Sequence, residues 1–384
     1  MASEAPRFAL SASEQGLLDA AHAIAAPYAG RTAALELAEL QTVFRQLAPT
    51  GYLASILPAE AGGKGLSPLA FAALVEGLAP DLTLLGNHSV QRYLNDFGTP
   101  AQCRRFLPGL LTGDEIGAIA ITETQAGSDL SRLETAARRD GAGWILDGRK
   151  TWVTHGLVAA TFIVLARTGA GASGFTRFIV PASTPGLERR PLSAVGLAHI
   201  GFAELVLSGC ALPDELRLGA EGEGASGTKA AFPLARTLAA LQALRVASAA
   251  LDIAAGYARE RIVAGRALAE QSLLQRSHAD LSARVEAARL LAYRVAADPA
   301  SADAIPLGSA AKALGGELAL DACRWALDSL GSTSLDAAHP LVRLHDDARM
   351  MAVVDGTSVL NHLVVARRGI ARRPARQSSS DADA

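Results

Sequence analysis

An aromatic ring beside hydroxyl groups is the feature of this sequence that most directly indicates a binding site. Trp152 and Thr154 lie two residues apart in Gly-Arg-Lys-Thr-Trp-Val-Thr-His-Gly, so on a strand both side chains would point from one face. An earlier block, Ala-Ile-Thr-Glu-Thr-Gln-Ala-Gly-Ser-Asp, contains Ser128 directly after a glycine that permits close backbone approach. A ring that stacks and hydroxyls that meet heteroatoms suit one flat, partly polar ligand.

The two blocks flank a segment of alternating apolar and polar residues, 134–146. This alternation closes at Asp140-Gly-Ala-Gly143, and alternation around a glycine-containing turn predicts a β-hairpin. A plainer interpretation of the same stretch is an ordinary hairpin with a buried tryptophan and no ligand.

Three domains are expected around this stretch. Residues 1–115 carry apolar residues at helical spacing and predict an α-helical domain. Residues 116–222 contain short β-branched runs between Gly and Pro and predict a small β-barrel or sandwich. Residues 223–375 return to helical spacing and predict a bundle of antiparallel helices. Residues 376–384 are polar and predict a disordered tail.

Capping and breaking residues place some of the helix ends. Ser67-Pro68 and Thr99-Pro100 fit an N-cap followed by a first helical residue, and the second helix is expected to end near Leu107. In the last domain, the expected separators between helices are residues 298–303, Gly315-Gly316 and residues 331–340.

Composition excludes several functional classes. Half of the 384 residues are hydrophobic and only 5% are aromatic, which favours helices over a mainly β architecture. The net charge is -2 without a basic stripe, so a nucleic-acid partner is not expected. The three cysteines, far apart and odd in number, show no disulfide or metal spacing and favour a cytoplasmic protein. We expect neither a signal peptide nor a membrane-spanning helix.

The two blocks resemble the acyl-CoA dehydrogenase family. Its motifs read Thr-Glu-Pro-x-Ala-Gly-Ser-Asp and Gly-x-Lys-x-Trp-x-Thr-Asn-Gly, at the separation found here. The stretch Gly-Thr-Pro-Ala-Gln-Cys-Arg-Arg-Phe-Leu-Pro, from residue 98, is close to a further family motif. The resemblance covers nearly the whole chain and implies the family's mainly α fold: a helical domain, a central β domain and a four-helix bundle.

The resemblance also implies an activity and a cofactor. Family members remove the α-proton of an acyl thioester with a carboxylate and pass the β-hydrogen as hydride to FAD. An α-proton beside a thioester is weakly acidic, so the base must lie within hydrogen-bond reach. Flavin supplies the hydride acceptor that no side chain can provide.

Asp355 occupies the position of the family's catalytic base. The family motif Tyr-Glu-Gly-Thr-Ser-Glu-Ile-Gln aligns with Val-Asp-Gly-Thr-Ser-Val-Leu-Asn, residues 354–361. Aspartate is one methylene shorter than glutamate, and a shift of about 1 Å in a reacting pair can cost on the order of 100-fold in rate. The competing interpretation is a helix-capping aspartate before Gly-Thr-Ser.

Other roles follow residue by residue from the same resemblance. Thr122, Trp152 and Thr154 would meet the flavin ring, and Thr357 would lie between cofactor and substrate. Ser128 and Gly356 would bind the substrate. Arg236 follows Ala235, where some members carry their base, and would steady a carboxylate or the pantetheine arm; the alternative is a solvated or ion-paired arginine.

The outer half of the cofactor site departs from the family. In the family, a second subunit contributes an Arg-x-x-Phe-Gly turn to the FAD pyrophosphate, which here reads Arg261-Ile-Val-Ala-Gly. The phosphate loop Gln-x-x-Gly-Gly becomes Asp328-Ser-Leu-Gly331-Ser, and an aspartate would repel a pyrophosphate. The family's Arg-Asp-Ala is Asp346-Asp-Ala.

Partners and alternatives remain open at this point. The phrase Gln125-Ala-Gly-Ser-Asp-Leu-Ser resembles a bacterial branch that oxidises substrates on acyl carrier proteins in secondary metabolism and polyketide biosynthesis. The family further implies an electron acceptor and a homodimer or homotetramer. Besides dehydrogenation, the fold admits other flavin chemistry, such as oxygenation or isomerisation, and a flavin-poor scaffold protein.

Overall fold

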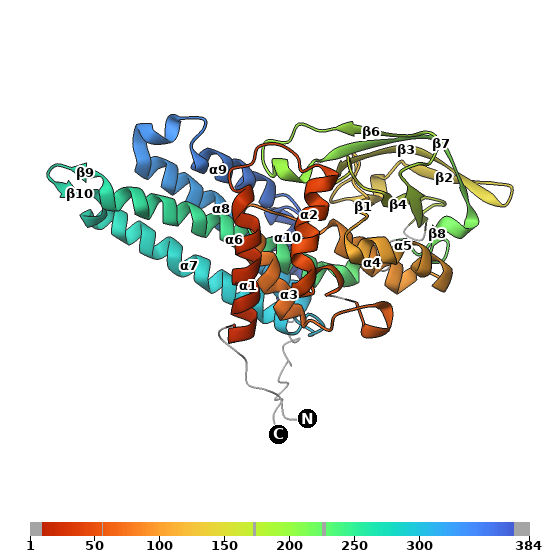
Figure 1. Ribbon diagram of the computed structural model, residues 1–384, viewed down its shortest axis with the longest axis horizontal. Coiled ribbons are helices and arrows are strands. Elements are labelled where there is room, and N and C mark those ends of the chain that lie inside the picture. The colour runs from red at the N-terminus through yellow and green to blue at the C-terminus, as the bar shows by residue number, and fades with distance from the viewer. Residues whose placement is uncertain (1–9, 56, 172–173, 225–227, 372–384) are drawn as a thin grey trace, which may run out of the picture.

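The computed structural model describes residues 10–55, 57–171, 174–224 and 228–371. The expected tail at 376–384 lies entirely outside the described residues. A helical layer, a sheet and a long helical bundle lie in chain order, with the bundle and the sheet extending to opposite sides (Figure 1).

Among the described residues, the N-terminal layer contains five α-helices whose ends follow local capping chemistry. Ser11 and Glu14 form a capping box at the first helix, and Thr99 and Gln102 form another at the fifth. Ser67 accepts the backbone N–H of Ala70 at 3.0 Å, as expected of an N-cap. The helices are α1 (Ala12–Ala25), α2 (Leu37–Leu47), α3 (Pro68–Leu78), α4 (Gly86–Phe97) and α5 (Pro100–Thr112).

The prediction that α5 ends near Leu107 is wrong, because the helix continues through Pro108 to Thr112. Proline removes one helical hydrogen bond. Burial of Leu110 offsets this loss, and its carbonyl also accepts the side-chain N–H groups of Asn87 and Gln91. Tertiary contacts therefore outweigh the local signal.

In the described residues, the central domain is one eight-stranded sheet. The sheet branches at β4, which pairs with three strands, β1, β2 and β5. Trp144 of β3 packs against Phe178 of β5 with ring centroids 5.2 Å apart, so the two halves face each other across a core. The strands are β1 (Gly117–Ala120), β2 (Ala136–Asp140), β3 (Gly143–Val153), β4 (Thr161–Arg167), β5 (Phe175–Pro181), β6 (Leu187–Pro191), β7 (Ala203–Pro213) and β8 (Arg217–Leu218). The expected β2–β3 hairpin is present, with paired residues Asp140 and Gly143 at its turn.

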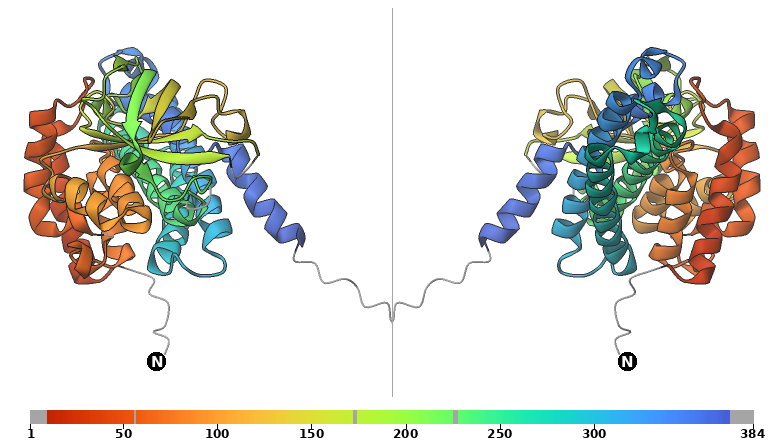
Figure 2. Two further views of the ribbon diagram at one scale, coloured as in Figure 1. Left: turned by 90° about the vertical axis from the view of Figure 1, so that its right-hand side faces the viewer. Right: turned by 90° about the vertical axis from the view of Figure 1, so that its left-hand side faces the viewer.

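The bundle is built from α6 (Thr228–Glu260), α7 (Ser272–Ala297), α8 (Ala304–Leu330), α9 (Pro340–Met351) and α10 (Ser358–Ala371). A hairpin of β9 (Ile262–Val263) and β10 (Arg266–Ala267) joins α6 to α7 at the far tip of the bundle (Figure 1). Figure 2 shows α10 leaning away from the body of the molecule. Residues 233–260 of α6 are long and apolar enough to cross a membrane, but most of that segment is buried among its neighbours, as in a core helix.

The prediction that Gly315-Gly316 separates two helices is wrong, because both residues lie inside α8. A Cβ built at Gly315 would lie 3.0 Å from the Ala240 carbonyl oxygen of α6. A Cβ at Gly316 would lie 2.9 Å from the Cα of Ala352, beyond the end of α9. The glycines therefore permit close packing on two sides of α8, and this packing offsets their low helix propensity.

Candidate active site

A buried ion pair joins the two sequence blocks. The Lys150 ammonium of β3 lies 2.7 Å from the Glu123 carboxylate and also donates to the Ile121 carbonyl at 3.0 Å. The carboxylate further accepts the backbone N–H groups of Glu134 and Thr135 at 2.7 and 2.9 Å. Burial alone would raise the pKa of Glu123, but these hydrogen bonds outweigh it and lower the pKa. The pair therefore fixes the first block against the strand that carries the second.

Thr122 and Trp152 are brought together by this arrangement. The backbone N–H of Thr151 donates to the Thr122 carbonyl at 2.9 Å. Trp152 lies in an irregularity between β3 and β7, has a φ of 57°, and leaves 46% of its surface exposed. Left-handed backbone at a large side chain is strained. The surrounding sheet leaves the indole partly in solvent, with an edge contact to Phe202, whose ring centroid is 5.7 Å away.

The expectation that Trp152 and Thr154 share one face of a strand is wrong. Strand β3 ends at Val153, and Thr154 is half-buried in the following turn. The left-handed conformation at Trp152 breaks the alternation on which the expectation relied. The two side chains remain close in sequence, but a bulge rather than a regular strand sets their directions.

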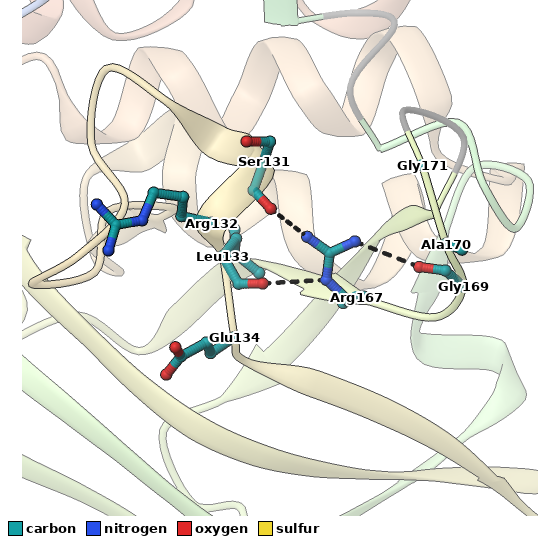
Figure 3. Close-up of a pocket in the computed structure, with 8 residues that line it drawn as sticks. All are labelled: Ser131, Arg132, Leu133, Glu134, Arg167, Gly169, Ala170 and Gly171. Atoms are coloured by element: carbon teal, nitrogen blue, oxygen red, sulfur yellow. Dashed lines mark hydrogen bonds between the residues drawn. The ribbon is translucent and has the colours of Figure 1, made fainter.

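Ser128 is exposed just before the 3₁₀ turn Leu130–Arg132. Ser131 and Arg132 of that turn, but not Ser128, line a shallow pocket of about 660 Å³. Figure 3 shows Arg167 between the two segments that line the pocket, with hydrogen bonds to both. Its guanidinium donates to the carbonyls of Ser131, Leu133 and Gly169 at 2.8, 3.0 and 3.4 Å. The pocket belongs to the outer surface of the β domain, and Asp355 is not among its lining residues.

Asp355 lies in the turn between α9 and α10, with left-handed backbone at Asp355 (φ 53°) and at Gly356 (φ 100°). Asn361 donates from its side-chain amide to the carbonyls of Gly356 and Thr357 at 2.9 and 3.1 Å and so fixes the turn. The hydroxyl that accepts the Leu360 N–H at the start of α10 belongs to Thr357. Asp355 is therefore not the residue that caps α10, so the alternative interpretation of Asp355 as a helix-capping aspartate is wrong.

Two cations act on the Asp355 carboxyl. The residue is exposed, yet protein surrounds the carboxyl closely enough that loss of hydration raises its pKa. Lys312 of α8 and Arg236 of α6 oppose the rise through their charges. Arg236 is buried and donates to the Ser309 hydroxyl at 2.7 Å, so the solvated alternative for this arginine is wrong.

An apolar cluster links the Trp152 region to the Asp355 turn. Phe202, which contacts Trp152, belongs to the same cluster as Met351, and Val354 packs against that cluster. One apolar cluster therefore connects the segment of the β domain that carries Trp152 with the bundle turn that carries Asp355.

Arg261 and Gly331 lie elsewhere. Arg261 follows the last residue of α6, 25 residues beyond Arg236, which is roughly 38 Å along a helix. It is exposed beside the β9–β10 hairpin, where Ala264 (φ 51°) and Gly265 (φ 78°) make the turn. Gly331 ends α8, and Asp328 is exposed one turn earlier. One chain therefore does not bring these residues to Asp355.

The residues present fit a flavin. An exposed, strained indole beside the hydroxyls of Thr122 and Thr154 offers a stacking face and polar contacts for a heteroaromatic ring. Thr357, at the N-terminus of α10, adds a hydroxyl near the carboxylate. Arg261, exposed at the far tip of the bundle, offers a guanidinium of the kind that binds phosphate.

Three family models match the chain in order. The acyl-CoA dehydrogenase N-terminal domain matches residues 13–114, the middle domain residues 118–210 and the C-terminal domain residues 222–370.

Several named proteins are similar over most of their length. Human mitochondrial short-chain specific acyl-CoA dehydrogenase is 31% identical over 84% of this chain and 81% of its own. Benzylmalonyl-CoA dehydrogenase of Aromatoleum aromaticum is 33% identical over 85% and 89%. The butyryl-CoA dehydrogenase structure from Megasphaera elsdenii superposes with a TM-score of 0.86 at 26% identity, covering 95% of this chain and 100% of that one. The prolyl acyl carrier protein oxidase AnaB gives a TM-score of 0.83 at 26% identity, over 94% and 99%.

The fold and the site define a flavin-dependent oxidoreductase that uses FAD. The chain belongs to the acyl-CoA dehydrogenase family. The predicted fold class is thereby confirmed.

Sequence reasoning missed three charged residues that organise the site: Glu123, Lys150 and Lys312. The first two stand within the motif blocks, where their charges in otherwise buried segments were the available signal. Lys312 stands alone in Ser-Ala-Ala-Lys-Ala-Leu-Gly-Gly, and a single lysine in a small-residue helix that must be buried was the corresponding signal.

Proposed function

We propose that this protein catalyses α,β-dehydrogenation of an acyl thioester, with Asp355 removing the α-proton. The observation that carries the proposal is the Asp355 turn. A carboxylate without a capping role is held in strained backbone, under the charges of two buried cations, in a turn that one apolar cluster connects to the Trp152 region. Strain that the surrounding structure maintains is typical of functional sites.

Each chain residue has a limited task in this proposal. When bound, FAD accepts the β-hydrogen as hydride, which is the one step that side chains cannot perform. Asp355 takes the α-proton onto its carboxylate, and Gly356 and Thr357 leave room for the acyl chain beside it. Arg236 stabilises the ionised carboxylate through its charge. Trp152, Thr122 and Thr154 shape the place where the cofactor ring lies.

The carrier of the acyl group is either coenzyme A or an acyl carrier protein. The likeness to the prolyl acyl carrier protein oxidase supports testing carrier-bound substrates, as in polyketide and other secondary metabolism. Gln125, the residue that suggested this branch, donates to the Glu123 carboxylate at 2.7 Å. The Gln125 side chain therefore also stabilises the buried Glu123 carboxylate. The experiment below compares both carriers.

We further propose a homo-oligomer in a reducing compartment, the cytoplasm. Val359, Leu363 and Ile370 are exposed on α10, which projects from the molecule (Figure 2). A second copy would cover this apolar face and bring its own Arg261 toward a cofactor site. All three cysteines are free thiols. Turnover also requires an electron acceptor, which reoxidises the reduced cofactor.

Anaerobic reduction of the FAD-loaded protein by a panel of CoA-bound and carrier-bound acyl groups tests the proposal. We expect the flavin absorbance to bleach with at least one thioester, faster as pH rises through the elevated pKa of Asp355. Asp355→Asn should abolish bleaching while FAD remains bound. Asp280→Asn, which removes an exposed carboxylate on α7, is the matched control and should bleach normally. Bleaching by Asp355→Asn at the unaltered rate would remove Asp355 from the mechanism.

A further inference from the structure

A buried lysine holds the helix end that precedes Asp355. The Lys312 side chain is completely buried in α8, and its ammonium donates to the Met351 carbonyl at 2.7 Å. Burying an ammonium beside a neutral carbonyl is costly, and the cost lowers the pKa of Lys312 to about 8. A group retained at such a cost is expected to do more than fill space, because a methionine would pack the same volume without a penalty.

The carbonyl that Lys312 binds is the one that a continuing helix would use. Met351 is the last residue of α9, and its carbonyl would otherwise accept the N–H four residues later, from Asp355. In the part of the chain that the structure describes, no backbone N–H binds this carbonyl; the N–H groups of Val353 and Val354 turn back to Met350 instead. Lys312 therefore satisfies a helix-end acceptor and lets the chain leave the helix.

Gly316 makes this contact possible from the same helix. It lies one turn beyond Lys312, and a Cβ there would meet Ala352, the residue after Met351. The missing side chain lets the end of α9 approach α8 closely enough for the short reach between Lys312 and the carbonyl. On the other side of the turn, Asn361 binds the carbonyls of Gly356 and Thr357. Asp355 is thus held from both sides, from α8 and from α10.

The structure assigns Lys312 the role of a positioning residue for Asp355: its ammonium holds the Met351 carbonyl, fixes the turn, and places a positive charge beside the carboxylate. This inference rests on the proposed role of Asp355 as base. Lys312 and Arg236 are the two cations that act on the Asp355 carboxyl among the described residues, one from each helix that faces it. Loss of the Lys312 charge should therefore make ionisation at position 355 harder.

Thiol titration at position 355 tests the charge without any catalytic turnover. Asp355→Cys replaces the carboxyl with a thiol, and its alkylation rate against pH reports the thiolate fraction. In this background, Lys312→Gln keeps a donor for the Met351 carbonyl but removes the charge, whereas Lys312→Met removes both. We expect about tenfold slower alkylation at pH 7 in either variant, the change that one pKa unit produces. Arg324→Met removes an exposed cation from the same helix and should leave the rate unchanged.

The outcomes separate the inference from the proposed function. Alkylation of the protein without Asp355→Cys gives the background from its own three cysteines. Unchanged alkylation in Lys312→Gln overturns the inference even when Lys312→Met fails to fold, because a purely structural lysine would alter stability alone. In the otherwise unaltered protein, Lys312→Gln should also shift flavin reduction to higher pH. A thiol shift together with no flavin reduction by any thioester would overturn the proposed function and leave the positioning role intact.

Discussion

At the scale of single residues, buried charges rather than apolar contacts hold the predicted ligand-binding residues in place. Glu123 and Lys150 are 3% and 0% exposed and fix the two motif blocks to each other. A buried ion pair seldom adds net stability, but removal of one partner leaves an uncompensated charge in the interior. The pair therefore disfavours any other arrangement of the segments that carry Thr122 and Trp152, because separating the two charges would leave each of them buried and unpaired.

Breaking this pair on one side should be costly. Lys150→Met leaves the Glu123 carboxylate buried, and we expect the free energy of unfolding to fall by about 3–5 kcal/mol. Urea denaturation measures this change, and the loss of bound FAD from the purified protein should accompany it. Adding Glu123→Gln to Lys150→Met should restore part of the stability. Arg149→Met, at an exposed neighbouring position, should stay within about 0.5 kcal/mol of the parent; an equal loss there would contradict the argument.

At the scale of elements, close approach between helices decides where the turn with Asp355 lies. Gly315 and Gly316 are adjacent in α8 but face different neighbours, α6 and the end of α9. The sequence pattern alone suggested a break at this pair, because glycine usually weakens helices. Both glycines instead lie inside a helix, because they pack against residues from distant parts of the chain. A local sequence pattern does not reveal such partners.

Adding one methyl group at each glycine in turn separates packing from function. Gly315→Ala and Gly316→Ala should each destabilise the protein by about 1–3 kcal/mol through overpacking, less the gain in helix propensity. Only Gly316→Ala pushes against Ala352, so only this variant should slow flavin reduction by thioester, on the order of 100-fold for a 1 Å displacement of the base. Stopped-flow absorbance and thermal unfolding supply the two measurements. Equal rates in both variants would show that the turn does not depend on this contact.

The limits of sequence-based prediction also appear at this scale. Helix positions, the β2–β3 hairpin and the domain order followed from periodicity and capping residues, because these signals are local. The left-handed backbone at Trp152 did not, since a non-glycine residue gives no local sign of a bulge. The role of Lys312 was equally hidden, because this lysine comes from a helix far from Asp355 in sequence. Arg236 was singled out only through the family resemblance.

At the scale of the whole molecule, three buried histidines set the response to acid. Loss of hydration lowers the pKa of His88 and His155 to about 4 and that of His199 to about 3. A histidine with a depressed pKa in the folded state contributes stability that is complete above pH 6.5 and is lost as pH falls toward 4. Burial raises the pKa of Asp347 to about 6. This residue therefore stabilises the folded protein increasingly as pH falls from about 6 to about 4.

For these four groups, the balance is an uptake of about two net protons on unfolding near pH 5. We therefore expect the free energy of unfolding to fall by about 3 kcal/mol per pH unit there, measured by urea denaturation from pH 7 to pH 4.5. His155→Asn should reduce the slope by about one proton, and asparagine tolerates the left-handed backbone at this position (φ 55°). An unaltered slope would mean that His155 is not among the groups that take up protons.

The length of α6 has a genetic consequence. Its uninterrupted run separates Arg236, near Asp355, from Arg261 by far more than one cofactor can span. In the proposed oligomer, each cofactor then draws its inner contacts from one polypeptide and its outer contacts from another. A chain defective at Asp355 and a chain defective at Arg261 would each be inactive alone. Co-expressed, they would complement each other, because each mixed dimer contains one site built entirely from intact halves.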